Sequence, residues 1–427
     1  MRWLVPLVLV AAAASALSTP PSATGSPYAR YGIQDDAWLM YGPGSIAERV
    51  ATLDRMGVSL VRVTLTWRDA APRRPANPRA HTDSAYRWRT ADEVLRALHA
   101  RGLTPVVTLW GTPRWANGGR SANWAPTSKW SLAAFAYAAQ KRYPFVSHWL
   151  VWNEPNQRRW LRPTSARVYT QQLLNPAYDA LKAAKRSTKV GGGVTAPRGA
   201  YGGVSPVDFI RGMDAARAKL DAYAHHPYPL RRGETPSRGG CGHCETVTMA
   251  TLERLLREVR SAFGRSKRVW LTEYGYQTNP PDRILGVSRA LQARYVGEAA
   301  RRIFNAPNVD MLIHYLYRDE PGVARWQSGL MTAGGSAKPS RRAYMVAMAQ
   351  AYRRGRTTAV WAHVRPGSGP QRYALQQFRH GAWRTVNGVY RTTKRGFLYR
   401  YVRAGKGSKL RIVHTPTRTV SPVLVVR

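Results

Sequence analysis

The chain has few acidic residues for its length, and they are unevenly spread. Of its 427 residues, 23 are Asp or Glu and 66 are Lys or Arg, which gives a formal net charge of +43. The 55 Arg against 11 Lys are typical of codon use in a GC-rich genome, which accounts for part of this basicity. It does not account for the absence of any Asp or Glu after Glu320. An end that is basic throughout predicts salt-dependent attachment to anionic polymers.

Cysteine is almost absent. The only two, Cys241 and Cys244, lie in the segment Cys-Gly-His-Cys. A zinc site would need further ligands at a matching spacing, and a redox site would need a thioredoxin-like βαβ setting that the sequence does not indicate. We therefore predict a small disulfide that closes a loop, as is usual in proteins outside the cytoplasm.

Long apolar runs are also missing beyond the N-terminus. Residues 3–14 are apolar but too few to cross a bilayer as a stable helix, and the small residues that follow them are typical of a cleaved secretory signal. The alternative is a single retained membrane anchor. We predict a signal peptide over residues 1–17, a flexible leader over residues 18–28, and a mature protein without a transmembrane segment that is secreted or associated with the cell envelope.

From residue 29 onward, strand-like and helix-like stretches alternate eight times. The expected strands are Tyr31–Gln34, Val58–Thr66, Leu103–Trp110, Val146–Trp152, Lys189–Val194, Leu220–Ala224, Val269–Thr272 and Met311–Tyr317. The last expected helix, Arg341–Tyr352, closes the series. Eight βα units predict an α/β fold, a (β/α)8 TIM barrel over residues 29–354. An open doubly wound sheet is the alternative, but no Gly-x-Gly-x-x-Gly turn follows the first strand.

Past Gly355 the pattern changes to short strands separated by turn residues, which predicts a small all-β sandwich over residues 355–427. Several aromatic residues lie among its basic ones: Trp361, Tyr373, Phe378, Trp383, Tyr390 and Tyr399. They form either the core of the sandwich or a platform for a glycan or nucleic acid, and we expect core.

Two glutamates mark the ends of predicted barrel strands. Glu154 follows the fourth strand in Trp-Asn-Glu-Pro-Asn, and Glu273 ends the seventh in Leu-Thr-Glu-Tyr-Gly. Strand ends of a barrel meet at the face that holds the catalytic residues. Two carboxylates about 5 Å apart across that mouth suit a retaining glycosidase, in which one is the acid and the other the nucleophile. Arg62 on the second strand is expected to keep the nucleophile charged.

These motifs resemble those of clan A retaining glycoside hydrolases, and the likeness covers roughly residues 31 to 352. The resemblance implies that Glu154 is the acid/base and Glu273 the nucleophile, with Asn153 donating a hydrogen bond to the 2-hydroxyl of the sugar. It also implies a set of substrate-binding residues: Arg62, Trp110, Asn153, His226, Tyr228 and Tyr315.

Within the clan, the segment Trp110–Trp115 is most similar to family 39 and its exopolysaccharide-hydrolase relatives. A family 5, cellulase-like enzyme is the second choice, because its usual histidine after the third strand has no counterpart here. The clan commonly has a Trp at the end of the eighth strand, where this chain has Tyr315 and Tyr317. Trp326 in the following loop is either a substitute for that Trp or a packing residue.

We therefore expect a secreted retaining glycoside hydrolase, independent of metals and cofactors, that cleaves O-glycosidic bonds of a β-linked poly- or oligosaccharide by a two-glutamate double displacement. The alternative is a non-catalytic, cationic glycan- or envelope-binding protein on a barrel scaffold. The expected partners are the polysaccharide substrate and, through the C-terminal module, anionic polymers of the cell envelope. Nucleic acid is not expected as a main partner, because the predicted export separates the protein from it.

Overall fold

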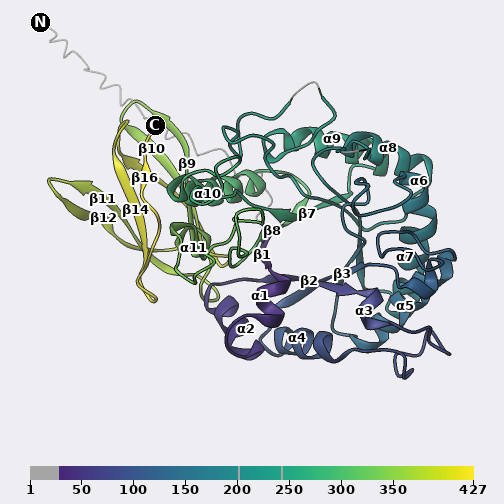
Figure 1. Cartoon of the computed structure of the whole chain (residues 1–427). Coiled ribbons are helices and arrows are strands. Elements are labelled where there is room, and N and C mark those ends of the chain that lie inside the picture. Colours follow the sequence, from purple (N-terminus) through teal and green to yellow (C-terminus); the bar gives the residue numbers. More distant parts are fainter. Residues whose placement is uncertain (1–27, 201, 242–243) are drawn as a thin grey trace, which may run out of the picture.

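The computed structural model describes residues 28–200, 202–241 and 244–427. The predicted signal peptide and all of the predicted leader except its last residue lie outside them. Eight parallel strands close into a barrel in chain order, with β8 beside β1 (Figure 1). They are β1 (Arg30–Gln34), β2 (Leu60–Thr66), β3 (Thr104–Trp110), β4 (His148–Val151), β5 (Lys189–Thr195), β6 (Ala222–His225), β7 (Arg268–Tyr274) and β8 (Val309–Tyr315). The predicted TIM barrel is confirmed.

Helices surround the barrel on its outer side (Figure 1). They are α1 (Asp36–Tyr41), α2 (Ile46–Arg55), α3 (Trp67–Ala70), α4 (Arg89–Ala100), α5 (Lys129–Arg142), α6 (Ala166–Val168), α7 (Asn175–Ala184), α8 (Pro206–Ala215), α9 (Leu252–Phe263), α10 (Arg289–Phe304) and α11 (Pro339–Met345). The sequence did not predict the short helices α1 and α3. The side chain of Asp35 accepts a hydrogen bond from the backbone of Trp38, which fixes the start of α1.

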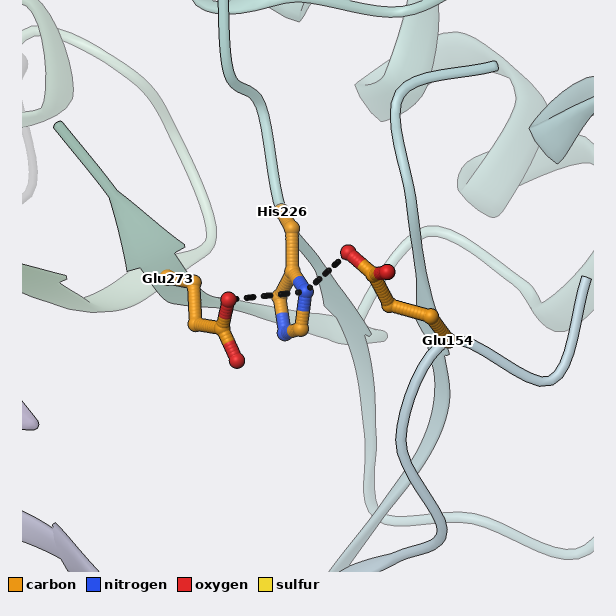
Figure 2. A group of neighbouring side chains, drawn as sticks. All are labelled: Glu154, His226 and Glu273. Carbon is orange, nitrogen blue, oxygen red and sulfur yellow. Dashed lines mark hydrogen bonds and ion pairs between the residues drawn. The ribbon is translucent and has the colours of Figure 1, made fainter. Parts of the chain in front are cut away.

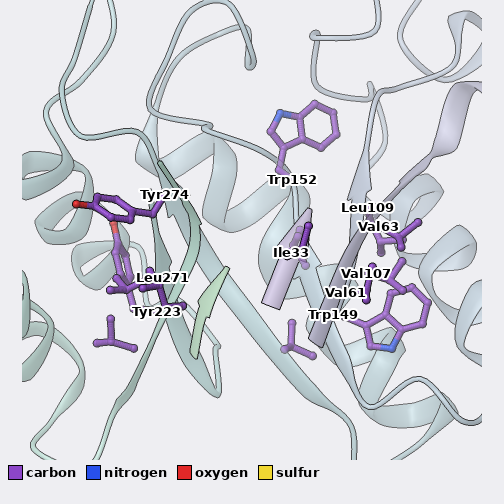
Figure 3. Packing of buried hydrophobic residues seen from close by; sticks show 14 of the residues in the cluster. Ile33, Val61, Val63, Val107, Leu109, Trp149, Trp152, Tyr223, Leu271 and Tyr274 are labelled. Atoms are coloured by element: carbon purple, nitrogen blue, oxygen red, sulfur yellow. The ribbon is translucent and has the colours of Figure 1, made fainter. Parts of the chain in front are cut away.

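Successive residues of each barrel strand face opposite ways, so the barrel has two apolar layers. Trp149 and Val151 of β4 belong to the outer layer, which packs against the helices. Figure 3 shows Trp149 together with other members of that layer. Leu150 points into the barrel and joins a smaller inner cluster with Trp270. A Cβ on Gly191 of β5 would lie 2.8 Å from Trp270, so the inner tryptophan requires glycine there.

The C-terminal region forms two antiparallel sheets, which confirms the predicted sandwich. One sheet has the order β13-β10-β9, and the other has β12-β11-β14-β15, with β16 beside β14. Their bounds are β9 (Val346–Arg354), β10 (Thr357–Val364), β11 (Arg372–Arg379), β12 (Ala382–Arg391), β13 (Phe397–Arg403), β14 (Lys409–His414), β15 (Thr419–Val420) and β16 (Leu424–Val425). Residues of both sheets share one apolar core.

The predicted closing helix Arg341–Tyr352 is wrong in its second half. Helix α11 ends at Met345, and the chain continues as β9, which pairs with β10. The C-terminal sheets therefore begin at Val346 rather than at residue 355. Along β9, Val346 and Met348 belong to the sandwich core whereas Ala347 and Ala349 belong to the barrel core. Because both faces of this strand are buried, the alternation of apolar and polar residues that signals a strand is missing.

The sandwich packs against α10 through aromatic side chains. Phe304 of α10 contacts Trp361 and Phe397, with ring centroids 5.5 and 4.8 Å apart. The expectation that the C-terminal aromatics form core holds for Trp361 and Tyr373, which are buried. It is wrong for Phe378 and Tyr399, each of which is 39% exposed. Among the described residues, no helix combines the length and apolarity needed to cross a bilayer.

Candidate active site

Glu154 lies three residues beyond the end of β4, on a loop with an unusual backbone. Trp152 and Glu154 have φ angles of 74° and 40°, in the left-handed region that side chains other than glycine rarely adopt. Such conformations cost about 1–3 kcal/mol each and persist only where neighbours fix them. Here the backbone N–H of Glu154 donates to the carbonyl of Val194 at 2.9 Å. Asn156, fully buried, accepts from the backbone of Ala196 at 2.8 Å.

Glu273 is the sixth residue of β7 and receives two hydrogen bonds. Arg62 of β2 donates from Nη1 to Oε1 at 2.5 Å, and the hydroxyl of Tyr228 donates to Oε2 at 3.1 Å. Both donors stabilise a negative charge on this carboxylate. The predicted contact between Arg62 and Glu273 is therefore present in the structure.

Arg62 is almost completely buried and ties several strand ends together. Its Nε donates to Thr108 of β3 at 2.8 Å, and its Nη1 donates to Gln34 of β1 at 2.7 Å. Its Nη2 donates to Oδ1 of Asn153 at 2.7 Å. Since this oxygen is occupied, the group that Asn153 can offer to a ligand is its Nδ2–H.

His226 lies between the two carboxylates, as Figure 2 shows. Its Nδ1 is 2.9 Å from Oε1 of Glu154 and 3.6 Å from Oε2 of Glu273. Burial lowers the pKa of His226 to about 3, so the ring is neutral at neutral pH. The Nη1 donor of Arg62 lies 3.3 Å from Nε2, which assigns the ring proton to Nδ1, the atom that faces Glu154.

The environment of Glu154 favours its protonated form. Burial raises the pKa of Glu154 to about 7, against the opposing effects of Arg62 and of a hydrogen bond with the Trp160 side chain. Its side chain is 17% exposed, so the carboxyl group is still reached from the barrel mouth. A carboxylic acid that is about half protonated at neutral pH is suited to give a proton and take it back.

Glu154, His226 and Glu273 each place one nitrogen or oxygen atom within 4.8 Å of the others. One histidine and two carboxylates are a possible ligand set for a divalent metal. However, Arg62 bonds Oε1 of Glu273 and lies 3.3 Å from Nε2 of His226, so a fixed positive charge adjoins two of the three groups and disfavours a second cation there. The arrangement therefore fits proton transfer and nucleophilic attack better than metal binding.

Comparison with known proteins agrees with this geometry. A sequence profile described as the glycosyl hydrolase catalytic core matches residues 64–296. The chain belongs to the glycosyl hydrolase catalytic core family. A search of curated protein sequences found no match.

Solved structures share the fold of this glycoside hydrolase at low sequence identity. A family 39 glycoside hydrolase from Bacteroides cellulosilyticus WH2 is 18% identical, with a TM-score of 0.61 over 88% of this chain and 80% of the other. A GH39 enzyme from Xanthomonas axonopodis pv. citri is 15% identical, with a TM-score of 0.56 over 88% and 91%. A GH5_18 protein from Bifidobacterium longum subsp. infantis is 17% identical, with a TM-score of 0.52 over 74% and 77%. The predicted likeness is confirmed at the level of the fold, since family 39 and family 5 structures are both among those that match.

The glycoside hydrolase has aromatic side chains beside its carboxylates. Tyr228 contacts Trp326 at a centroid distance of 5.0 Å, and Tyr315 contacts Trp326 at 5.5 Å in an edge-to-face arrangement. Trp110 stands against Trp160 at 5.3 Å, and its buried Nε1 has no hydrogen-bond partner among the described residues. All of the predicted substrate-binding residues therefore lie at or beside the mouth, and Trp326 joins them.

Sequence reasoning missed the residues that hold this site in place. Gln34 and Thr108 escaped notice, although a polar residue near the end of a barrel strand is a usable signal. Lys338, fully buried, donates to Asp319 at 2.8 Å and to the carbonyl of Gln327 at 3.0 Å. This ion pair fixes the loop that carries Trp326, and nothing in the sequence pairs its two members.

The predicted disulfide is present between Cys241 and Cys244. It lies in the loop between β6 and α9, the loop that also carries Tyr228. The side chain of Arg254 in α9 donates to the carbonyl of Cys244, which connects this loop to the helix that follows it.

Proposed function

We propose that the hydrolase cleaves β-linked glycosides with retention of configuration, with Glu154 as acid/base and Glu273 as nucleophile. The observation that carries the proposal is the 4.8 Å limit on the distance between their carboxylate oxygens. Retaining enzymes hold their two carboxyl groups about 5–5.5 Å apart, whereas inverting enzymes leave about 6.5–9.5 Å for a water molecule.

In the first step, the Glu154 carboxylic acid gives its proton to the glycosidic oxygen as the bond from that oxygen to the anomeric carbon breaks. An oxygen of the Glu273 carboxylate forms a bond to the same carbon. In the second step, water loses a proton to Glu154 and displaces Glu273, which leaves as a carboxylate. Arg62 and Tyr228 hold Glu273 in place and stabilise the negative charge that returns to it.

Two experiments test these roles. Glu273→Gln should abolish turnover of an aryl glycoside, and a 2-deoxy-2-fluoro aryl glycoside should add its sugar mass to the peptide that contains Glu273 in the wild type. In Glu154→Ala, azide should restore activity on substrates with good leaving groups and yield a glycosyl azide of retained configuration. A first-formed product of inverted anomeric configuration, observed by NMR, would exclude the mechanism.

We also propose that the substrate is a β-linked poly- or oligosaccharide outside the cytoplasm, since residues 1–17 have the composition of a secretory signal. Expression of the full chain in a bacterial host should release protein whose N-terminus lies near residue 18. Recovery of the full-length chain in the cytoplasm would contradict export.

A further inference from the structure

A candidate binding surface lies on the C-terminal sandwich, on the sheet farther from the barrel. The hairpin of β11 and β12 projects on the side of the module away from the barrel (Figure 1). In β11, Tyr373 and Leu375 face the sandwich core, so Phe378 belongs to the opposite, outer face. Phe378 pairs across the strands with Trp383 of β12.

This outer face carries apolar side chains around an open recess of about 370 Å³. Phe378, Trp383, Lys409 and Val423 line it. The two rings are 5.4 Å apart at an angle of 63°, so they form a corner rather than a flat stack. Val423 is 48% exposed at its rim. Rings and aliphatic groups exposed together in this way usually mark an interaction site.

Two cations border the same corner. The guanidinium of Arg411 lies 4.2 Å from the ring of Trp383, and Nζ of Lys409 lies 5.6 Å from the ring of Phe378. Gln376 accepts a hydrogen bond from Nε of Arg411 at 2.8 Å, which fixes that side chain. The chain has no Asp or Glu beyond residue 320, so no acidic side chain of this module competes for either cation.

We propose that this recess is a non-catalytic binding site for an anionic polysaccharide. A sugar ring that carries an acidic group has an apolar C–H face and a negative charge a few ångströms apart. The corner of Phe378 and Trp383 fits the apolar face of the sugar, and the cations of Lys409 and Arg411 fit its negative charge. A DNA duplex presents phosphates but stacks its bases inside, so it leaves the aromatic corner unfilled. The choice of polysaccharide rests on the proposed function.

A binding site on the sandwich would increase the local concentration of polymer substrate around the barrel. A polymer held on the sandwich keeps its remaining length near the catalytic mouth, which raises its effective concentration without any new contact at Glu154 or Glu273. The benefit applies to long substrates only. Short aryl glycosides, which cannot span both sites, are hydrolysed independently of the recess.

The test uses the full-length protein and two soluble polyuronates, polygalacturonate and alginate, in affinity electrophoresis and calorimetry. Fully methyl-esterified polygalacturonate is the uncharged reference. Trp383→Ala should weaken polyuronate binding about tenfold, the size expected for loss of an anchoring aromatic residue. Lys409→Gln should reduce the preference for the charged polymer over its ester, because Arg411 alone then remains at the corner. Both variants should keep the wild-type kinetics on an aryl glycoside, which also shows that they fold.

Trp130→Ala is the matched control. Trp130 is an exposed ring on α5 with Nζ of Lys129 4.9 Å from it, so its removal deletes a similar aromatic–cation pair outside the recess. Its binding should equal that of the wild type.

Three results would overturn the proposal: neither polyuronate binds, Trp383→Ala binds as tightly as Trp130→Ala, or single-stranded oligothymidylate binds as tightly as the polyuronates. A wild type that binds polyuronate without cleaving any aryl glycoside would instead count against the proposed function and leave this site standing.

Discussion

The raised pKa of Glu154 predicts the pH dependence of the enzyme. For a substrate with a poor leaving group, kcat/KM requires the protonated acid. With a pKa of about 7, one molecule in about ten is competent at pH 8 and one in about a hundred at pH 9. We therefore expect kcat/KM on an alkyl glycoside to fall about tenfold per pH unit above neutrality.

Glu154→Gln removes the titrating group without changing the size of the side chain. On the alkyl glycoside its kcat/KM should fall by a factor of about 10²–10⁴, and the alkaline decline should disappear. On a dinitrophenyl glycoside, whose leaving group needs no proton, the first step should stay close to wild type in burst measurements. Glu93→Gln, which changes the same charge on the exposed surface of α4, should leave the profile unaltered.

The raised pKa of Glu154 also makes the free energy of unfolding depend on pH. Its pKa is higher in the folded chain than the ordinary value of 4.5, so the folded state favours the proton. That contribution is fully present below pH 4.5 and is lost as the pH rises through 7, a change of about 3 kcal/mol. In denaturant unfolding at pH 8, the free energy of unfolding of Glu154→Gln should exceed that of the wild type by up to about 3 kcal/mol. At pH 4 the two free energies should be equal. An alkaline decline that persists in Glu154→Gln, together with equal stabilities at pH 8, would refute the assignment.

Three further predictions follow from the same contacts. Arg62→Lys keeps the positive charge but loses the planar guanidinium, whose two terminal nitrogens bond Glu273 and Asn153 at the same time. We therefore expect kcat to fall at least about a hundredfold while KM changes little. Trp326→Ala opens the wall beside Tyr228 and Tyr315 and should raise KM for oligosaccharides several-fold, whereas Trp130→Ala should not. Burial lowers the pKa of His225 to about 3 and of His314 to about 4, so both histidines take up protons on unfolding below pH 6.5. Each histidine should therefore lower the free energy of unfolding by about 2 kcal/mol between pH 6.5 and pH 5, as measured by denaturant titration.

The barrel and the meeting of Glu154 with Glu273 at its mouth could be predicted because both leave a pattern in the sequence. Apolar strands alternate with helical spacings over the whole barrel, and the chain interval between Glu154 and Glu273 places them on strands that face each other across the mouth. The strand β9 could not be predicted, because burial on both faces leaves it without alternation.

Other features of the site depend on distant contacts and have no local pattern. A tryptophan gives no sign that it will adopt a φ of 74°, yet Trp152 does so, held by hydrogen bonds from its backbone N–H to the carbonyl of Leu109 and from its Nε1 to the carbonyl of Trp160. The position of Trp326 depends on an ion pair between Lys338 and Asp319, residues that the sequence does not connect.

The roles that we propose for the two glutamates differ because their neighbours differ, since the side chains are chemically the same. Glu273 receives a hydrogen bond from the cation of Arg62 and another from Tyr228, and both donors stabilise a negative charge on it. Glu154 has no cation bonded to it among the described residues, and burial raises its pKa to about 7, so it holds a proton near neutral pH. Because Arg62 reaches across from β2 and bonds Glu273 directly, while it affects Glu154 only through space, one buried cation distinguishes the proposed nucleophile from the proposed acid.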